Sequence, residues 1–122
     1  MSIQLPVPIE RYFQIANSGR AEAASECFAP DATVYDEGQT YKGVAAIRNW
    51  MAATKKKYDH TVAPLEFTEH GDQSVLKARL AGSFPNSPIT VNFNFALASG
   101  TIRSLEIRSL AAISSLRARA RW

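Results

Sequence analysis

The chain has 122 residues, enough for one domain with a sizeable core that needs no disulfide or metal to hold it together. Its 46% apolar and 20% charged residues are typical of globular proteins and exclude wholesale disorder. The net charge of +3 is concentrated in Arg117, Arg119 and Arg121. The rest of the chain has equal numbers of basic and acidic residues, which argues against a nucleic-acid-binding surface.

The first part of the chain predicts two helices. Pro8 suits the start of a helix that runs from Ile9 to about Asn17, with Tyr12 on its apolar face. The turn signal Ser18-Gly19 follows it. A second short helix is expected over Ala21 to Phe28, so the two helices form a hairpin that must cover another layer.

The fold prediction rests mainly on the stretch from Phe28 to Trp50. Ala32 to Asp36 is β-branched and aromatic and predicts a strand, and Gly38 permits a tight turn into a short strand, Gln39 to Lys42. A helix opens at Gly43, because its apolar residues recur at the spacing of one buried face.

Alternation along the first of these strands links a core residue to a carboxylate. Val34 and Asp36 lie on one side, and Tyr35 lies on the other. If Val34 faces the core, Asp36 is carried inward with it.

The second half of the chain changes to a strand period. Four strands are predicted, and the alternation is clearest where Phe93 and Phe95 share a face opposite Asn92 and Asn94. Short connections favour antiparallel neighbours. The predicted strands are Thr61 to Glu69, Ser74 to Gly82, Ile89 to Leu97 and Thr101 to Leu110.

These elements predict an α+β fold in which a cone-shaped, curved antiparallel sheet wraps around three helices. The order is helix, helix, strand, strand, helix, then four strands. The open end of such a cone is a usual place for a small ligand. Residues 1–110 form the predicted domain. Residues 111–122 are expected to form a basic C-terminal tail, either a weak helix, a disordered end or a cap on a partner subunit.

Several segments resemble the nuclear transport factor two superfamily and, within it, the SnoaL-like branch of polyketide cyclases and ketosteroid isomerases. The resemblance covers roughly Ile9 to Leu110 and implies the same cone-shaped fold. It is specific for the fold, whereas members of the superfamily differ in function. The segments that carry it read PIERYFQIANSG, FAPDATVYDEG, KGVAAIRNW and SGTIRSLEI.

The resemblance to the ketosteroid isomerases implies two site residues. Tyr12 matches the tyrosine that donates a hydrogen bond to the substrate oxyanion, and Asp36 matches the aspartate that moves the proton. A third group of those enzymes, a protonated aspartate, would fall between Val91 and Asn94, where this sequence has no acid. A true steroid isomerase is therefore not expected.

Each candidate also has a structural explanation. Asp36 can bond the amides of its turn or pair with Arg108, and Tyr12 can be a core aromatic. His60 and His70 are best explained as surface residues, and Cys27 as a buried structural thiol. The side chains predicted to line a pocket are Val34, Trp50, Tyr58, Leu80, Phe84, Phe93 and Leu105.

Two functions from different classes remain open. One is a cofactor-free isomerase or cyclase that uses Asp36 as general base on a small apolar carbonyl compound. The other is a non-catalytic ligand-binding or dimeric association module. We expect no metal, because no cluster of Cys, His and carboxylates has ligand spacing, and no other cofactor, because phosphate-binding and dinucleotide motifs are absent.

The expected partners are a small hydrophobic molecule and a second copy of the chain, paired through the outer sheet face around Asn92 and Asn94. A nucleic acid or a membrane is not expected. No apolar run approaches the ~18 residues of a membrane-spanning helix, and the N-terminal residues lack the features of a signal peptide. The sequence thus predicts a cytoplasmic protein.

Overall fold

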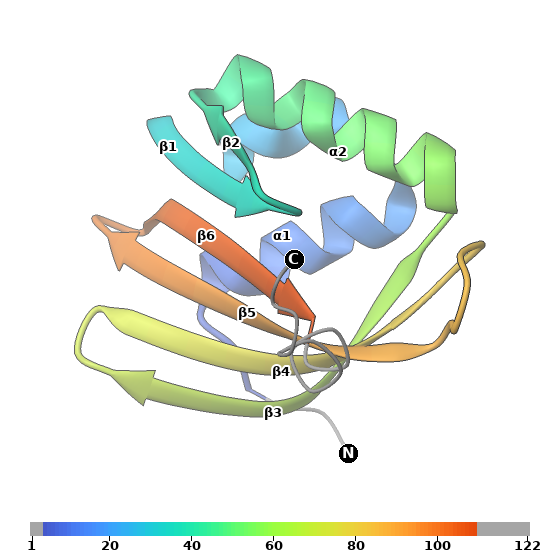
Figure 1. The fold of residues 1–122 in the computed structure, drawn as a ribbon. Helices are drawn as coiled ribbons and strands as arrows, with labels where there is room; N and C mark the ends of the chain where they lie inside the picture. The colour runs from blue at the N-terminus through green and yellow to red at the C-terminus, as the bar shows by residue number, and fades with distance from the viewer. Residues whose placement is uncertain (1–3, 110–122) are drawn as a thin grey trace.

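The computed structural model describes residues 4–109, which form one curved sheet of six strands with three helices on its concave side (Figure 1). The elements follow the predicted order. They are α1 (Val7–Ser18), the 3-10 helix η1 (Ala21–Glu26), β1 (Phe28–Asp36), β2 (Gln39–Lys42), α2 (Val44–Tyr58), β3 (Thr61–His70), β4 (Gln73–Ala81), β5 (Ile89–Ala98) and β6 (Thr101–Ser109).

The strands lie in the order β2-β1-β6-β5-β4-β3, so β2 and β3 form the two edges and the sheet stays open. The predicted α+β fold is confirmed. All neighbouring strands are antiparallel except β1 and β6, which run parallel. Short connections favour antiparallel pairing only between consecutive strands, and β1 and β6 are far apart in sequence.

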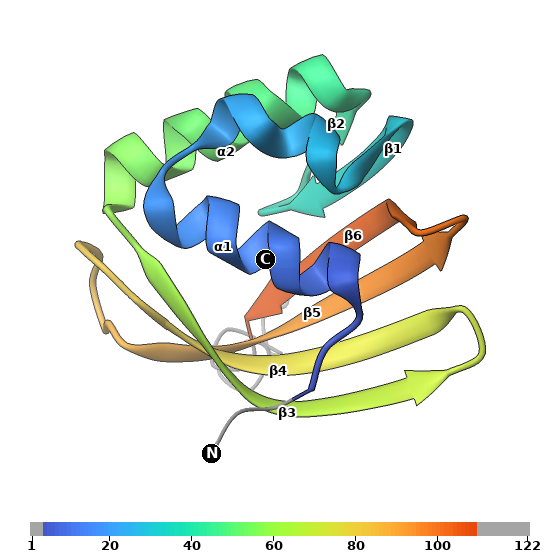
Figure 2. The same cartoon turned by 180° about the vertical axis from the view of Figure 1, so that it is seen from behind.

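The helices cover the concave face in two places. Helix α1 packs against β3 and β6, whereas α2 packs against β1, β2 and η1 (Figure 2). In the described part of the chain, no helix combines the length and the apolar character needed to cross a membrane. The predicted tail, residues 111–122, lies outside the described residues.

The largest difference from the predicted element boundaries lies at the start of β1. Phe28 opens β1 instead of ending a helix, so the strand begins four residues before its predicted start at Ala32. The register between β1 and β6 shifts between Phe28 and Thr33. Such an irregularity accommodates a proline, which has no N–H to donate to the sheet.

The core is built from alternating strand residues and the apolar face of α1. Phe93 and Phe95 point inward from β5, as the alternation predicts, and their exposed fractions are 2% and 0%. The Tyr12 ring of α1 packs edge-on against Phe28 and Phe95, with centroid separations of 5.7 and 6.0 Å. Aromatic rings thus join helix α1 to the sheet.

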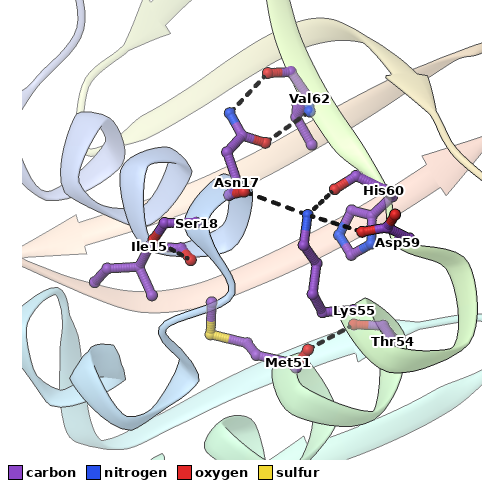
Figure 3. Close-up of polar contacts among 9 residues, drawn as sticks. All are labelled: Ile15, Asn17, Ser18, Met51, Thr54, Lys55, Asp59, His60 and Val62. Carbon is purple, nitrogen blue, oxygen red and sulfur yellow. Dashed lines mark hydrogen bonds and ion pairs between the residues drawn. The ribbon is translucent and has the colours of Figure 1, made fainter.

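Polar contacts hold the turn between α2 and β3 in place (Figure 3). The Asn17 side chain at the end of α1 donates to the Val62 carbonyl over 3.1 Å and accepts from the Val62 N–H over 2.8 Å. Lys55 of α2 donates to the carbonyl oxygens of Asn17 and His60. The start of β3 is therefore tied to both α-helices.

The same turn is approached closely by the segment that follows β4. The Ser83 N–H donates to the Tyr58 carbonyl over 2.7 Å, and the Gly82 N–H donates to Ser87 Oγ over 2.9 Å. A Cβ atom on Gly82 would lie 2.6 Å from the Tyr58 carbonyl oxygen and 3.0 Å from the His60 Cα. Both obstacles are backbone atoms, which cannot rotate away.

Gly82→Ala is therefore expected to lower the free energy of unfolding by about 1–3 kcal/mol, because the two segments must separate to admit the methyl group. Urea unfolding followed by circular dichroism measures the change. Ser83→Ala is the matched control, since it keeps the backbone hydrogen bond and adds no atom to the contact. An unchanged unfolding midpoint in Gly82→Ala would show that this close approach is not required.

Candidate functional site

A cavity of about 180 Å³ lies between the sheet and the helices α1 and α2. It is bounded by α1, the end of β1, the inner face of α2 and residues of β3 to β6. Its walls are mostly apolar. An engineered cavity of about 150 Å³ in another protein binds benzene, so this space suits a molecule with about one ring. Drug-sized ligands occupy larger pockets, of about 300–1,000 Å³.

Most of the residues predicted for the site lie around this cavity. The two proposed catalytic residues, Tyr12 and Asp36, both line it. The pocket candidates that also line it are Trp50, Tyr58, Leu80, Phe84 and Phe93.

Val34 and Leu105 do not line the cavity. They face each other across the parallel pair of β1 and β6, and both are fully buried in the core. The next inward-facing pair along these strands, Asp36 and Ile107, borders the cavity instead. Alternation predicted the correct face of the strands, but the cavity begins one pair further along.

The Asp36 carboxylate is half-buried at the cavity wall, where its Oδ2 accepts a hydrogen bond from Trp50 Nε1 over 3.0 Å. Burial raises the pKa of Asp36 to about 6, the Trp50 hydrogen bond opposes this increase, and the nearby Glu37 adds to it. A base with a pKa close to neutral is suited to moving protons at physiological pH.

Within residues 4–109, the Asp36 carboxylate contacts neither of the two partners that the sequence suggested, the amides of its turn and Arg108. Its side-chain hydrogen bond goes to α2 and not to the amides of the following turn. Arg108 instead donates two hydrogen bonds to Glu106, over 2.8 and 2.9 Å. The carboxylate therefore has no guanidinium partner among residues 4–109 that would lower its pKa.

The Tyr12 side chain is 3% exposed and is held by aromatic rings. Its hydroxyl makes no hydrogen bond to residues 4–109, and the residue lines the cavity. Burial raises the pKa of Tyr12 far above its usual value, and the Asp36 carboxylate raises it further. Tyr12 thus stays protonated and can donate throughout the physiological pH range.

A histidine that the sequence interpretation placed on the surface lies at this site. His60 lines the cavity, and its Nδ1 is buried without a hydrogen bond to the described residues. Burial lowers the pKa of His60, as does the Lys55 ammonium. His70 is exposed, as expected. No sequence signal separates the two histidines, since both lie at a strand end beside charged residues.

The cavity wall formed by β5 presents Phe93, while its neighbour Asn92 points to the opposite face of the sheet. Phe93 lines the cavity, and alternation turns Asn92 away. This wall has no acid that could assist Tyr12, as the sequence predicts, and the amide of Asn92 does not take its place.

The raised pKa of Asp36 has a measurable cost in stability. Between about pH 4 and pH 6 the folded state holds a proton that the unfolded state has lost, so stability falls as the pH rises through this interval. Asp36→Asn removes the buried charge and keeps an acceptor for Trp50. It is expected to raise the thermal unfolding midpoint at about pH 8 but not at about pH 4.

Thermal scans of both proteins at the two pH values test this expectation. Asp31→Asn is the matched control, because Asp31 is exposed on the same strand. Equal shifts at both pH values would contradict a buried, destabilising carboxylate.

Comparisons with known proteins agree with this architecture. A family model described as a SnoaL-like domain matches residues 9–104. The crystal structure of a proposed polyketide cyclase from Sinorhizobium meliloti is 41% identical to the chain and has a TM-score of 0.82. The match covers 85% of this chain and 95% of that one. A search of curated proteins produced no match.

Two further solved structures share the fold at lower identity. A protein with a ketosteroid isomerase-like fold from Catenulispora acidiphila, crystallised with trimethylamine, is 20% identical with a TM-score of 0.78, and the match covers 98% of both chains. SalBIII, an epoxide hydrolase/cyclase-like enzyme in pyran ring formation, is 22% identical with a TM-score of 0.72, over 84% of this chain and 87% of its own. Because the family model spans most of the chain, this protein belongs to the SnoaL-like domain family.

Proposed function

We propose that this protein is a cofactor-free isomerase or cyclase acting on a small apolar carbonyl compound, with Asp36 as the general base and Tyr12 as the hydrogen-bond donor to the carbonyl oxygen. The observation that supports this function is the presence of both groups at one largely apolar cavity. Asp36 has a pKa of about 6, and the Tyr12 hydroxyl makes no hydrogen bond to residues 4–109. Proton abstraction beside a carbonyl needs these two groups.

The chemistry proceeds through an enolate. Asp36 removes a proton from the carbon beside the carbonyl. The electron pair of the C–H bond forms a carbon–carbon double bond, and the π pair of the carbonyl moves onto its oxygen. The Tyr12 hydroxyl donates a hydrogen bond to that oxygen as its negative charge develops. The protonated Asp36 then returns the proton to another carbon of the conjugated system, which isomerises the double bond.

Cyclisation uses the same first step. The enolate carbon attacks a second carbonyl carbon of the same molecule, which closes a ring and leaves an alkoxide. The protonated Asp36 supplies the proton that neutralises it, so the carboxylate is regenerated. Trp50 supports both reactions, because its hydrogen bond to Oδ2 orients the carboxylate. The proposal assigns the proton transfer to Oδ1.

The size of the cavity limits the substrate. A space of about 180 Å³ holds about one ring, so most of a steroid would lie outside it. The SnoaL-like relatives include a proposed polyketide cyclase, which is consistent with a carbonyl substrate.

Deuterium exchange into a simple ketone tests the proposal. The protein is incubated with benzylacetone, a one-ring ketone, in deuterated buffer, and proton NMR follows loss of the signals beside the carbonyl. Exchange above the buffer rate supports a general base in the cavity. Binding of the ketone without exchange would favour the alternative function, a non-catalytic ligand-binding module, and the absence of both would overturn the proposal.

We also infer a homodimer that pairs through the outer face of the sheet. Asn92 lies on this face between Lys77 and Arg108, and its Oδ1 is buried without a hydrogen bond to the described residues. A second copy would cover this face of the sheet. Sedimentation equilibrium of the wild type and of Asn94→Arg tests this. A wild-type monomer at micromolar concentration contradicts it.

We further propose that the dimer acts in the cytoplasm.

A further inference from the structure

A second hollow adjoins the cavity. A groove of about 460 Å³ is lined by α2, by β2 and by the turn between β1 and β2. Helix α2 packs against both of these strands (Figure 1). The residues that line the groove as well as the cavity are Glu37, Trp50, Thr54 and Tyr58. Because the cavity holds only about one ring, a longer ligand needs a neighbouring space of this kind.

The groove arises where small residues of α2 lie beside a short edge strand. The residues of α2 that line it recur at spacings of three and four, so they lie on one face of the helix. Ala46 and Ala53 contribute only methyl groups to this face. Strand β2 has four residues and forms an edge of the sheet, so no further strand covers the groove within residues 4–109. The helical residues of this face are Ala46, Asn49, Trp50, Ala53, Thr54 and Lys57.

The proposed general base lies where the two spaces adjoin. Trp50, which lines both, donates its hydrogen bond to Asp36 Oδ2 over 3.0 Å. Glu37, which also lines both, is the residue that follows Asp36. A ketone whose reacting carbon lies at Asp36 therefore has one side in the cavity and its other side next to the groove.

The groove suits an uncharged, apolar group. The Tyr41 and Trp50 rings pack together, with centroids 5.8 Å apart and planes inclined by 32°, and form an aromatic surface. The Thr54 hydroxyl donates to the Trp50 carbonyl over 3.0 Å, so its donor is occupied within the helix. In the described part of the chain, the charged residues of the groove are one carboxylate, Glu37, and one ammonium, Lys57. An ion of either sign would meet a like charge as well as an opposite one, whereas an apolar chain gains by leaving water.

We propose that the groove is a second substrate-binding subsite, which takes an apolar chain on the side of the carbonyl opposite to the ring, so that the substrate is an elongated ketone with apolar groups on both sides of its carbonyl. This inference rests on the proposed function, because it places the carbonyl beside Asp36. It adds the requirement for a chain that continues past the cavity.

Two ketones of different length test the inference. Benzylacetone has a methyl group on the side of its carbonyl opposite to the ring, and 1-phenyloctan-3-one has a pentyl group in the same place. Isothermal titration of both ligands gives the ratio of their affinities for each protein. Each of the four added methylenes is expected to tighten binding to the wild type about twofold to fourfold, the range for removing half or all of a methylene from water.

A paired set of variants locates this gain in the groove. Ala46→Leu/Ala53→Leu fills the groove with larger side chains, and the affinity ratio is expected to fall to at most a few-fold. Ala45→Leu/Ala52→Leu is the matched control, because it makes the same changes one position earlier on the same helix. Ala45 and Ala52 are exposed and line neither space, so the ratio should not change. Because only the ratio is compared, a general loss of stability does not imitate the effect.

NMR of the wild type gives a second measurement that needs no substitution. With ¹³C-labelled alanine methyl groups, 1-phenyloctan-3-one is expected to shift the signals of Ala46 and Ala53 more than benzylacetone does. The signal of Ala52 should respond to neither ketone, since this residue lies outside the groove.

The outcomes separate this inference from the proposed function. If benzylacetone binds and exchanges its protons but the pentyl group brings no gain, the groove subsite is wrong and the Asp36 chemistry stands. A gain that survives in Ala46→Leu/Ala53→Leu, or alanine signals that do not respond to the longer ketone, likewise overturns the subsite. If the longer ketone binds in the groove and neither ketone exchanges, the subsite stands and the general-base function fails. If neither ketone binds to the wild type, the proposed function fails and this inference fails with it.

Discussion

Asp36→Asn is expected to slow enzyme-catalysed exchange of the ketone protons by about 10²- to 10⁴-fold, the usual contribution of a general base. Asparagine has nearly the same shape and still accepts the hydrogen bond from Trp50, but it cannot take up a proton at neutral pH. Ligand binding should therefore remain while exchange is lost, which separates chemistry from affinity.

The pH dependence gives a second readout of the same residue. A carboxylate acts as a base only when it is ionised, so the wild-type rate should rise with pH and level off above about 6, the pKa of Asp36. An unperturbed aspartate would level off near pH 4 instead. The residual rate of Asp36→Asn should not show this rise.

Exposed Asp31 supplies the control, and Asp31→Asn should keep the full rate and pH profile. If Asp36→Asn keeps more than a tenth of the wild-type rate, the base is a different residue. Glu37 and His60 also line the cavity, and Glu37→Gln and His60→Gln would then test each of them as the base.

Tyr12→Phe is expected to lower the exchange rate by about 10²- to 10³-fold, because it removes the donor that stabilises the charge developing on the carbonyl oxygen. The loss should fall on the rate at saturating ketone rather than on affinity, since the donor acts mainly in the transition state. Phe93 occupies the wall where a second donor would stand, so no other side chain of β5 compensates.

The Tyr12 substitution should leave stability almost unchanged. The hydroxyl has no hydrogen bond to the described residues, so its removal orphans no buried group, and the phenyl ring keeps its packing against Phe28 and Phe95. Tyr58→Phe is the control, because it removes another hydroxyl from the cavity wall. A loss of less than about tenfold in Tyr12→Phe would contradict its role as the oxyanion donor.

The ionised Asp36 carboxylate suits a catalytic role, although it lowers the stability of the folded protein. Its raised pKa means that the ionised carboxylate destabilises the folded state at neutral pH, and asparagine is expected to be the more stable choice. A side chain that lowers stability and lies at a cavity is characteristic of sites used for chemistry.

The order of the elements and the faces of the strands were determined by the sequence alone. Side chains alternate along any extended strand, so a buried Val34 places Asp36 on the same inner face whatever surrounds the strand. The periodicity of α1 likewise places Tyr12 on its buried face. These features depend on residues that are close together in the chain, so they can be predicted from the sequence.

Only the tertiary structure decided which inward residues border the cavity. The parallel pairing of β1 with β6 sets Val34 beside Leu105 in the core and Asp36 beside Ile107 at the cavity. His60 is half-buried, and the segment containing Gly82 packs against its backbone, although the two residues lie 22 positions apart in the sequence. Contacts of this kind join distant segments, so no local pattern encodes them, and the depth of each side chain emerges only when the sheet and helices are packed together.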